Sequence, residues 1–322
     1  MEISAIRQPV AGDMQAVDGV ILRRLESDVV LVNQIGHYIV SSGGKRLRPL
    51  AVLLAARGCG YTGTQHIEMA AVVEFIHTAT LLHDDVVDGS EQRRSRDTAN
   101  AVWGNEASVL VGDFLYSRAF EMMVDVNIMR VMDVMSHATN RIAEGEVMQL
   151  LNCHDPDTTE ARYMEVIKRK TATLFEAGTQ LGAVLAEADA DIEQAMADYG
   201  RSLGIAFQLV DDALDYGSSG AELGKNIGDD LAEGKPTLPI IHAIETGTAE
   251  ERELLQQAIQ TGGREHIDAV ARAIETTDSI EYTIGLAREC AEAARAKLSV
   301  LPESAERTAL TLLADFAVHR TY

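Results

Sequence analysis

The stretch HIEMAAVVEFIHTATLLHDDVVD, residues 66–88, joins a long apolar run to three carboxylates at its end. The run is apolar on nearly every side of a helix, which predicts a helix buried at the centre of the molecule. Asp84, Asp85 and Asp88 are costly there, because two like charges about 4 Å apart repel by roughly 4 kcal/mol at an effective dielectric of about 20. The sequence therefore predicts a positive partner for these carboxylates that the chain itself does not supply.

Helical periodicity also dominates the rest of the chain. Apolar residues recur at three- and four-residue intervals in the long segments 16–40, 107–126, 128–151, 159–188 and 192–216. Period-two alternation does not stand out, and neither a low-complexity linker nor a solenoid-like repeat is found. We therefore expect residues 1–322 to form one all-α domain.

The composition narrows the function classes. The chain has 322 residues and a formal net charge of −22, which disfavours non-specific nucleic-acid binding because that needs clustered Lys and Arg. Cys59, Cys153 and Cys290 lie far apart without CxxC spacing, which argues against a structural zinc site or a disulfide framework and favours a reducing compartment. The N-terminus is not signal-like and no run approaches about 18 apolar residues, so the sequence predicts a cytoplasmic protein.

One motif recurs. DDVVD at residues 84–88 returns as DDALD at residues 211–215, and each copy ends an apolar helical run. Residues four apart share a helix face, so the first and last carboxylates of each copy face the same way. A single copy would be read as a solvated helix end, but two copies on strongly apolar helices favour a binding site.

These carboxylates are hard oxygen ligands. Only His83 offers a nitrogen beside them and no cysteine is adjacent, so the set favours Mg²⁺ over Zn²⁺. Mg²⁺ keeps several waters and completes its shell with substrate phosphates. Two such clusters facing each other would hold several ions around a polyphosphate.

Basic and polar residues accompany both motifs. They suit a diphosphate, because Arg binds its oxygens through a bidentate fork and Lys acts as a point charge. Taken singly, each basic residue would more often be a surface residue, and His77 would more often be a core histidine. The candidates are Lys45 and Arg48 in GGKRLRP, His77, Arg93 and Arg94, Lys170 and Thr171 in KRKTATLF, Gln208, and Lys225 and Lys235 in LGKNIGDDLAEGKPTLP.

Together these motifs resemble the trans-isoprenyl diphosphate synthase family over nearly the whole chain. The matching strings are GGKRLRP, HTATLLHDDVVDGSEQRR, GDFLYSRAF, AEGEVMQL, KTATLFEAG, AFQLVDDALDY and LGKNIGDDLAEGKPTLP, in that order. The resemblance implies a single-domain helical bundle of the isoprenoid synthase type with a central substrate cavity. It also implies an enzyme that adds isopentenyl diphosphate head-to-tail and in trans to an allylic diphosphate, with farnesyl diphosphate as the expected primer.

The resemblance assigns a role to each candidate. About three Mg²⁺ ions, bridging the allylic diphosphate, would be bound by Asp84, Asp88 and Asp211, while Asp85, Asp212 and Asp215 would ligate or orient. The allylic diphosphate would be held by Arg93, Lys170, Thr171, Gln208, Lys225 and Lys235, and isopentenyl diphosphate by Lys45, Arg48, His77 and Arg94. The catalytic set would be Asp84, Asp88, Asp211, Lys170 and Lys225, which would act by stabilising the leaving group while water is excluded.

Product length is a separate expectation. Within the family the chain looks most like the bacterial octaprenyl diphosphate synthases, which supply quinone side chains; geranylgeranyl and nonaprenyl or decaprenyl products are the alternatives. The family places chain-length control just before the first motif, where Ala79 and Thr80 leave a path that bulky aromatics would block. The growing chain would pass Ile76 and stop against Met123 and Met135, although methionines also serve simply to fill gaps in cores.

One departure from the family pattern follows the paired arginines. The family usually reads Gly-x-Pro-Thr there, whereas this chain has Ser95, Arg96, Asp97 and Thr98. Losing Gly and Pro changes the turn preferences, which bears on how this loop closes over substrate.

Other classes fit the motifs less well. A terpene cyclase normally carries one DDxxD and needs no isopentenyl site, and a non-catalytic subunit of a heteromeric synthase typically loses its acidic clusters. A plain acidic scaffold would need neither motif. The resemblance further implies a homodimer formed through the central helices, and a peripheral membrane contact through the hydrophobic product stays open.

Overall fold

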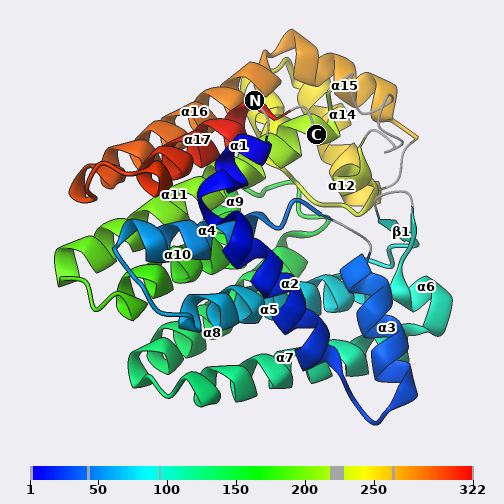
Figure 1. The fold of residues 1–322 in the computed structure, drawn as a ribbon. Coiled ribbons are helices and arrows are strands. Elements are labelled where there is room, and N and C mark those ends of the chain that lie inside the picture. The colour runs from blue at the N-terminus through cyan, green and yellow to red at the C-terminus, as the bar shows by residue number, and fades with distance from the viewer. Residues whose placement is uncertain (1–2, 42–43, 94–95, 218–227, 263–264, 321–322) are drawn as a thin grey trace.

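Nearly all of the described chain is helical, so the all-α expectation is confirmed (Figure 1). The computed structural model describes residues 3–41, 44–93, 96–217, 228–262 and 265–320. Its α-helices are α1 (Ile3–Arg7), α2 (Ala11–Leu25), α3 (Val30–Ser41), α4 (Leu47–Gly58), α5 (Gln65–Val87), α6 (Ala99–Trp103), α7 (Asn105–Val126), α8 (Met129–Asn152), α9 (Glu160–Ile167), α10 (Thr173–Leu185), α11 (Ala190–Asp215), α12 (Asp229–Ala232), α13 (Leu238–Thr246), α14 (Ala249–Thr261), α15 (Ile267–Thr276), α16 (Ser279–Lys297) and α17 (Ala305–His319). Shorter turns are η1 (Gln8–Val10), the π-helical turn η2 (Lys168–Ala172) and η4 (Leu298–Val300). Among the described residues, no helix is both long and apolar enough to cross a membrane.

The described residues also contain a small hairpin that the periodicity did not reveal. β1 (Gln92–Arg93) pairs antiparallel with β2 (Arg96–Asp97). The Thr98 hydroxyl then donates to the Ser90 carbonyl at 2.7 Å and closes the base of the hairpin. Strands of two residues are too short to show an alternating pattern, which is why sequence reasoning missed them.

Helix α5 runs through the middle of the bundle (Figure 1). Helices α2, α4, α7 and α10 all pack against it. Val72, Val73, Phe75 and Ile76 are completely buried, so side chains on several faces of the helix meet protein. Each such side chain contributes about 1.5–3 kcal/mol through burial. The central burial predicted from the apolar run is therefore confirmed.

Glycines let the inner helices approach closely. A Cβ atom on Gly182 of α10 would lie 2.5 Å from the backbone nitrogen of Ala56 in α4. A Cβ on Gly200 of α11 would lie 2.4 Å from the Phe175 carbonyl oxygen of α10. Real Cβ atoms do not come this near to backbone, so α4, α10 and α11 are held at separations that only glycine allows.

Both acidic motifs end long helices of this bundle. α5 ends at Val87 with Asp88 as its C-cap, and α11 ends at Asp215. The last helix, α17, packs against α11, α4 and the N-terminal helix α1. The last helix therefore lies beside two of the elements that carry candidate site residues.

The Gly200 contact gives a stability prediction. We expect Gly200→Ala to destabilise the protein by about 1–3 kcal/mol, because the new methyl group overlaps the backbone of α10. Gly285→Ala is the matched control: this glycine is also helical, but its Cβ would meet nothing within 4 Å. There we expect a gain of about 0.5–1 kcal/mol from helix propensity. Urea unfolding of both variants measures the difference, and equal stabilities would contradict the close packing.

Candidate active site

The outer carboxylates of the first motif are paired with lysines from elsewhere in the chain. Lys170 Nζ lies 3.3 Å from Asp84 Oδ2, and Lys235 Nζ donates to Asp88 Oδ2 at 2.7 Å. All four side chains are mostly buried. Burial lowers the pKa of Lys170, but Asp84 and other acids raise it more, so the net shift keeps the lysine charged. From the sequence we expected positive charge only from outside the chain, but in this structure two lysines of the chain itself supply it.

The middle carboxylate of the first motif points inward. Asp85 is 2% exposed, and its Oδ1 accepts hydrogen bonds from Arg93 Nε at 2.9 Å and Nη2 at 2.7 Å. Burial raises the pKa of Asp85 and the arginine opposes that rise. In this structure Arg93, which the resemblance assigned to a diphosphate, holds Asp85 instead.

The middle carboxylate of the second motif is also internal. Asp212 Oδ2 accepts a 2.5 Å hydrogen bond from the Tyr163 hydroxyl, and its Oδ1 accepts one from Gln208 Nε2 at 2.6 Å. Thr171 Oγ1 in turn donates to Gln208 Oε1 at 3.0 Å. Burial raises the pKa of Asp212 well above its usual range. Thr171 and Gln208 are thus brought together, one turn away from the exposed carboxylate of this motif.

The two other carboxylates of the second motif differ from each other. Asp215 accepts the backbone N–H groups of Asp229 and Asp230 at 3.3 and 3.2 Å, and so fixes the start of α12. Asp211 is 39% exposed at its side chain and lies 3.3 Å from Nη2 of Arg320. Within the described residues, Asp84, Asp88 and Asp211 therefore pair with long cationic side chains, whereas the remaining three aspartates are tied into the protein.

A π-helical turn positions Lys170. The turn η2 adds a residue to the helix between α9 and α10, a feature that often marks functional sites. Gly145 of α8 lets this turn approach, since a Cβ there would lie 2.6 Å from the Lys170 nitrogen. Lys170 Nζ also contacts Glu146 at 2.5 Å and donates to Gln149 Oε1 at 2.6 Å. Burial raises the pKa of Glu146 to about 7 despite the neighbouring lysine.

The residues expected at the isopentenyl site form a second group. Arg48 Nη1 and His77 Nε2 lie 3.1 Å apart, which joins α4 to α5. The Arg48 guanidinium lies 4.6 Å from the centre of the Phe175 ring. Lys45 Nζ lies 5.2 Å from the centre of the Phe316 ring on α17. Aromatic faces attract such cations and hold them in place.

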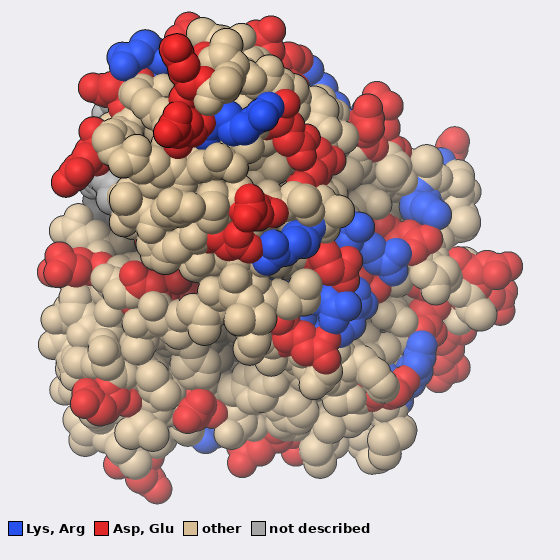
Figure 2. Space-filling model, turned by 180° about the vertical axis from the view of Figure 1, so that it is seen from behind, with Lys and Arg blue, Asp and Glu red and all other residues tan. Residues whose placement is uncertain are grey.

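Charge pairing is also visible at the surface. Figure 2 shows basic side chains lying among acidic ones in a band across the middle of the face opposite to that of Figure 1. With a net charge of −22, the chain keeps the basic side chains on this face beside acids instead of in a separate positive patch.

A small cavity is lined by Asp212 of the second motif and by the lysines that pair with the first. Its volume is about 60 Å³, room for about two waters. Lys170 and Lys235, the partners of the first motif, line it together with Gln208 and Asp212 of α11. The remaining lining residues are Gln149, Asn152, Tyr163, Val166, Ile167, Thr171, Asp230, Pro236 and Thr237.

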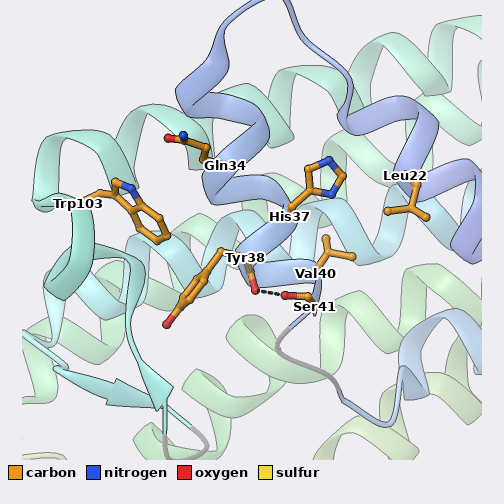
Figure 3. Close-up of a pocket in the computed structure, with 7 residues that line it drawn as sticks. All are labelled: Leu22, Gln34, His37, Tyr38, Val40, Ser41 and Trp103. Carbon is orange, nitrogen blue, oxygen red and sulfur yellow. Dashed lines mark hydrogen bonds between the residues drawn. The ribbon is translucent and has the colours of Figure 1, made fainter.

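A larger cavity of about 600 Å³ lies elsewhere (Figure 3). It is formed by α2, α3 and α6, where Tyr38 and Trp103 pack edge to face with ring centres 5.0 Å apart. Its lining contains no acidic residue and none of the candidate site residues: Leu22, Gln34, His37, Tyr38, Val40, Ser41 and Trp103. By size alone this cavity would be the candidate active site, but the charged side chains that line the smaller cavity favour the smaller one.

The donors fit a hard divalent cation without forming a closed cage. Asp84, Asp88 and Asp211 offer carboxylate oxygens that pair, among the described residues, with flexible cationic side chains. Within the described ranges, no three His, Cys, Asp or Glu side chains converge closely enough to hold a metal alone. That combination suits Mg²⁺, which takes one or two carboxylates and leaves the rest of its shell to water and phosphate.

The remaining residues named from the sequence fall into three sets. Arg94, Lys225 and Ser95 lie outside the described residues. Ile76, Ala79, Met123 and Met135 are completely buried in the main hydrophobic core. The Thr80 hydroxyl donates to the His77 carbonyl at 2.8 Å.

Comparison with known proteins places the chain in a family. The polyprenyl synthetase family model matches residues 29–277. The chain belongs to the polyprenyl synthetase family. It is 54% identical over 321 residues to octaprenyl diphosphate synthase of Escherichia coli (strain K12), covering 99% of each chain. It is 45% identical to all-trans-nonaprenyl-diphosphate synthase (geranyl-diphosphate specific) of Rhodobacter capsulatus, over 98% of this chain and 97% of that one.

A solved structure supports the same family. The crystal structure of polyprenyl synthase from Caulobacter crescentus CB15, complexed with calcium and isoprenyl diphosphate, superposes with a TM-score of 0.96. The two chains share 44% sequence identity, and the match covers 100% of this chain and 98% of that one. The isoprenoid synthase type of fold, expected from the motifs, is confirmed.

Sequence reasoning missed several side chains around the motifs. Glu146 and Gln149 lie in the matching string AEGEVMQL, so a closer look at that string would have found them. Tyr163 precedes Lys170 by two helical turns, a weak signal. Arg320 carries no sequence signal at all, because only the fold brings the chain end to Asp211.

Proposed function

We propose that this chain is a Mg²⁺-dependent trans-polyprenyl diphosphate synthase that adds isopentenyl diphosphate units to an allylic diphosphate, with octaprenyl diphosphate as its product. The observation that carries the proposal is the lining of the small cavity. It contains Lys170 and Lys235, which pair with Asp84 and Asp88 of the first motif, together with Asp212 of the second motif. The names of the relatives support the reaction class.

The side chains have distinct roles in this proposal. Asp84, Asp88 and Asp211 would hold about three Mg²⁺ ions. Mg²⁺ would supply charge neutralisation for the leaving diphosphate. Lys170 and Lys235, now held by aspartates, would turn to the diphosphate once metal occupies those carboxylates. Their charge would then stabilise the leaving group where it develops.

The acceptor would lie on the α4 side of the site. Lys45, Arg48 and His77 would hold the diphosphate of isopentenyl diphosphate, so that its double bond faces the allylic carbon. Loss of the allylic diphosphate leaves a carbocation, the double bond attacks it, and the released diphosphate takes the proton. The apolar surroundings of α5 and α10 would keep water from that carbocation. This scheme requires no protein nucleophile.

Two residues on α5 would leave room for a long product. Ala79 and Thr80 are small, and the fully buried Ile76, Met123 and Met135 would line or end the path below them. An octaprenyl product is supported by the relative with 54% identity, and a nonaprenyl product by the one with 45% identity.

We also propose that the enzyme acts as a homodimer through α7 and α8. Monomers seldom expose many large apolar side chains on adjoining helices. Sedimentation equilibrium would contradict the dimer by giving the monomer mass of 34.9 kDa. The exposed residues that would form the contact are Leu110, Val124, Met129, Val147, Leu150 and Leu151.

The reaction itself is tested with farnesyl diphosphate and labelled isopentenyl diphosphate. We expect Mg²⁺-dependent incorporation with octaprenyl diphosphate as the main product. Asp84→Asn should lower the rate by at least about 100-fold, because it removes a metal-binding charge. Asp268→Asn on α15, an exposed carboxylate outside the site, is the control and should leave the rate unchanged. No incorporation by the parent protein would overturn the proposal.

The proposed product path gives a separate prediction. Ala79→Tyr should shorten the main product while leaving Mg²⁺-dependent incorporation in place, because the new ring would block the chain just below the first motif. Products are resolved by chain length in the same assay. An unchanged product length in a folded, active variant would show that the growing chain takes another route.

A further inference from the structure

Arg320, the last residue that the structure describes, lies beside the second acidic motif. Arg320 directly follows α17, and its Nη2 donates to the Phe207 carbonyl at 2.8 Å and lies 3.3 Å from Asp211 Oδ1. The Arg320 side chain is 5% exposed, whereas that of Asp211 is 39% exposed. A buried guanidinium therefore lies next to a carboxylate that is partly exposed to solvent.

The Arg320 guanidinium is held in place, but one of its N–H groups has no hydrogen-bond acceptor among the described residues. Its Cζ lies 3.7 Å from the centre of the Phe207 ring, which fixes its plane. Its Nε is buried and has no hydrogen-bond partner among the described residues. An unpaired buried donor is costly, so such an atom indicates a position at which an acceptor is expected.

Two aromatic rings connect this arginine to the other cationic group. The Phe207 and Phe175 rings are neighbours, with centres 5.8 Å apart, and Arg48 lies over Phe175. Lys45 lies over Phe316, which is on the same helix as the end of the chain. Arg320 thus lies between Asp211 and the Lys45–Arg48 group.

We propose that Arg320 is a further active-site residue, which makes metal binding at Asp211 depend on the simultaneous presence of a diphosphate. This inference rests on the proposed synthase function. A fixed positive charge 3.3 Å from Asp211 opposes a divalent cation that arrives alone. The same charge attracts a diphosphate, whose oxygens can accept from the guanidinium. Arg320 therefore weakens binding of free Mg²⁺ and strengthens binding of Mg²⁺ with diphosphate.

Titration calorimetry on the full chain tests this with two probes: Mg²⁺ alone, and inorganic pyrophosphate in the presence of Mg²⁺. In Arg320→Met the stem that covers Phe207 is kept and the charge is removed. We expect affinity for Mg²⁺ alone to rise by about threefold or more, and affinity for pyrophosphate to fall by about tenfold. A rise in Mg²⁺ affinity together with a fall in pyrophosphate affinity is diagnostic, because a merely structural role would lower both affinities.

Two further variants complete the test. Arg320→Lys keeps the charge without the planar fork, so Mg²⁺ alone should bind as weakly as in the parent while pyrophosphate affinity recovers only in part. Arg295→Met removes the 2.8 Å ion pair between α16 and Asp315 of α17 without touching Asp211, and should change neither affinity.

The outcomes separate the two proposals. If both affinities fall together in Arg320→Met, or neither changes, the coupling role is overturned while the synthase function stands. If the parent protein binds no pyrophosphate with Mg²⁺ and Asp84→Asn behaves identically, the synthase function fails and this inference fails with it.

Discussion

The repulsion among carboxylates at the ends of two buried helices is the constraint on which the rest of the site depends. Neither α5 nor α11 supplies cations in its last turn. The compensating charges must therefore come from distant parts of the chain, and they do: Lys170 from η2, Lys235 from the segment after α12, Arg93 from the hairpin and Arg320 from the end of α17. The fold is arranged so that these four elements reach two helix ends.

Helical geometry divides each motif into an inner and an outer part. Consecutive residues are turned by about 100°, so the second aspartate of each copy faces the core when the first and fifth face outward. Asp85 and Asp212 are accordingly buried and saturated by neutral or cationic donors. Three of the outer carboxylates, Asp84, Asp88 and Asp211, differ in kind, because each pairs with a flexible cationic side chain. The fourth, Asp215, accepts backbone N–H groups at the start of α12. Rigid inner carboxylates thus orient the helix ends, and exchangeable outer ones are left for ligands.

The sequence predicts the helices and the residues of the motifs, but not the contacts that join them. Periodicity identified α5 as central because an apolar run long enough for six turns has few other places to lie. It could not reveal the β1–β2 hairpin or the extra residue of η2, since neither leaves a repeating pattern. Tyr163 and Arg320 were missed for a different reason: each meets its aspartate across many residues of chain, and such contacts depend on how α9, α11 and α17 pack. The pairing of Arg93 with Asp85 was likewise hidden, because the sequence shows both charges but not their geometry.

The acidity of the whole chain gives these internal pairs a further consequence. A protein with a net charge of −22 attracts Mg²⁺ and repels free diphosphate at long range, although salt screens this field beyond about 8–10 Å. A permanent positive patch would overcome the repulsion but would also bind phosphates of every kind. Lysines paired with aspartates present little net charge until a cation takes the carboxylate from them. Under the proposed function, the site therefore becomes positive only when metal and diphosphate arrive together. The clustered aspartates, whose mutual repulsion is visible in the sequence, neutralise the lysines until that moment.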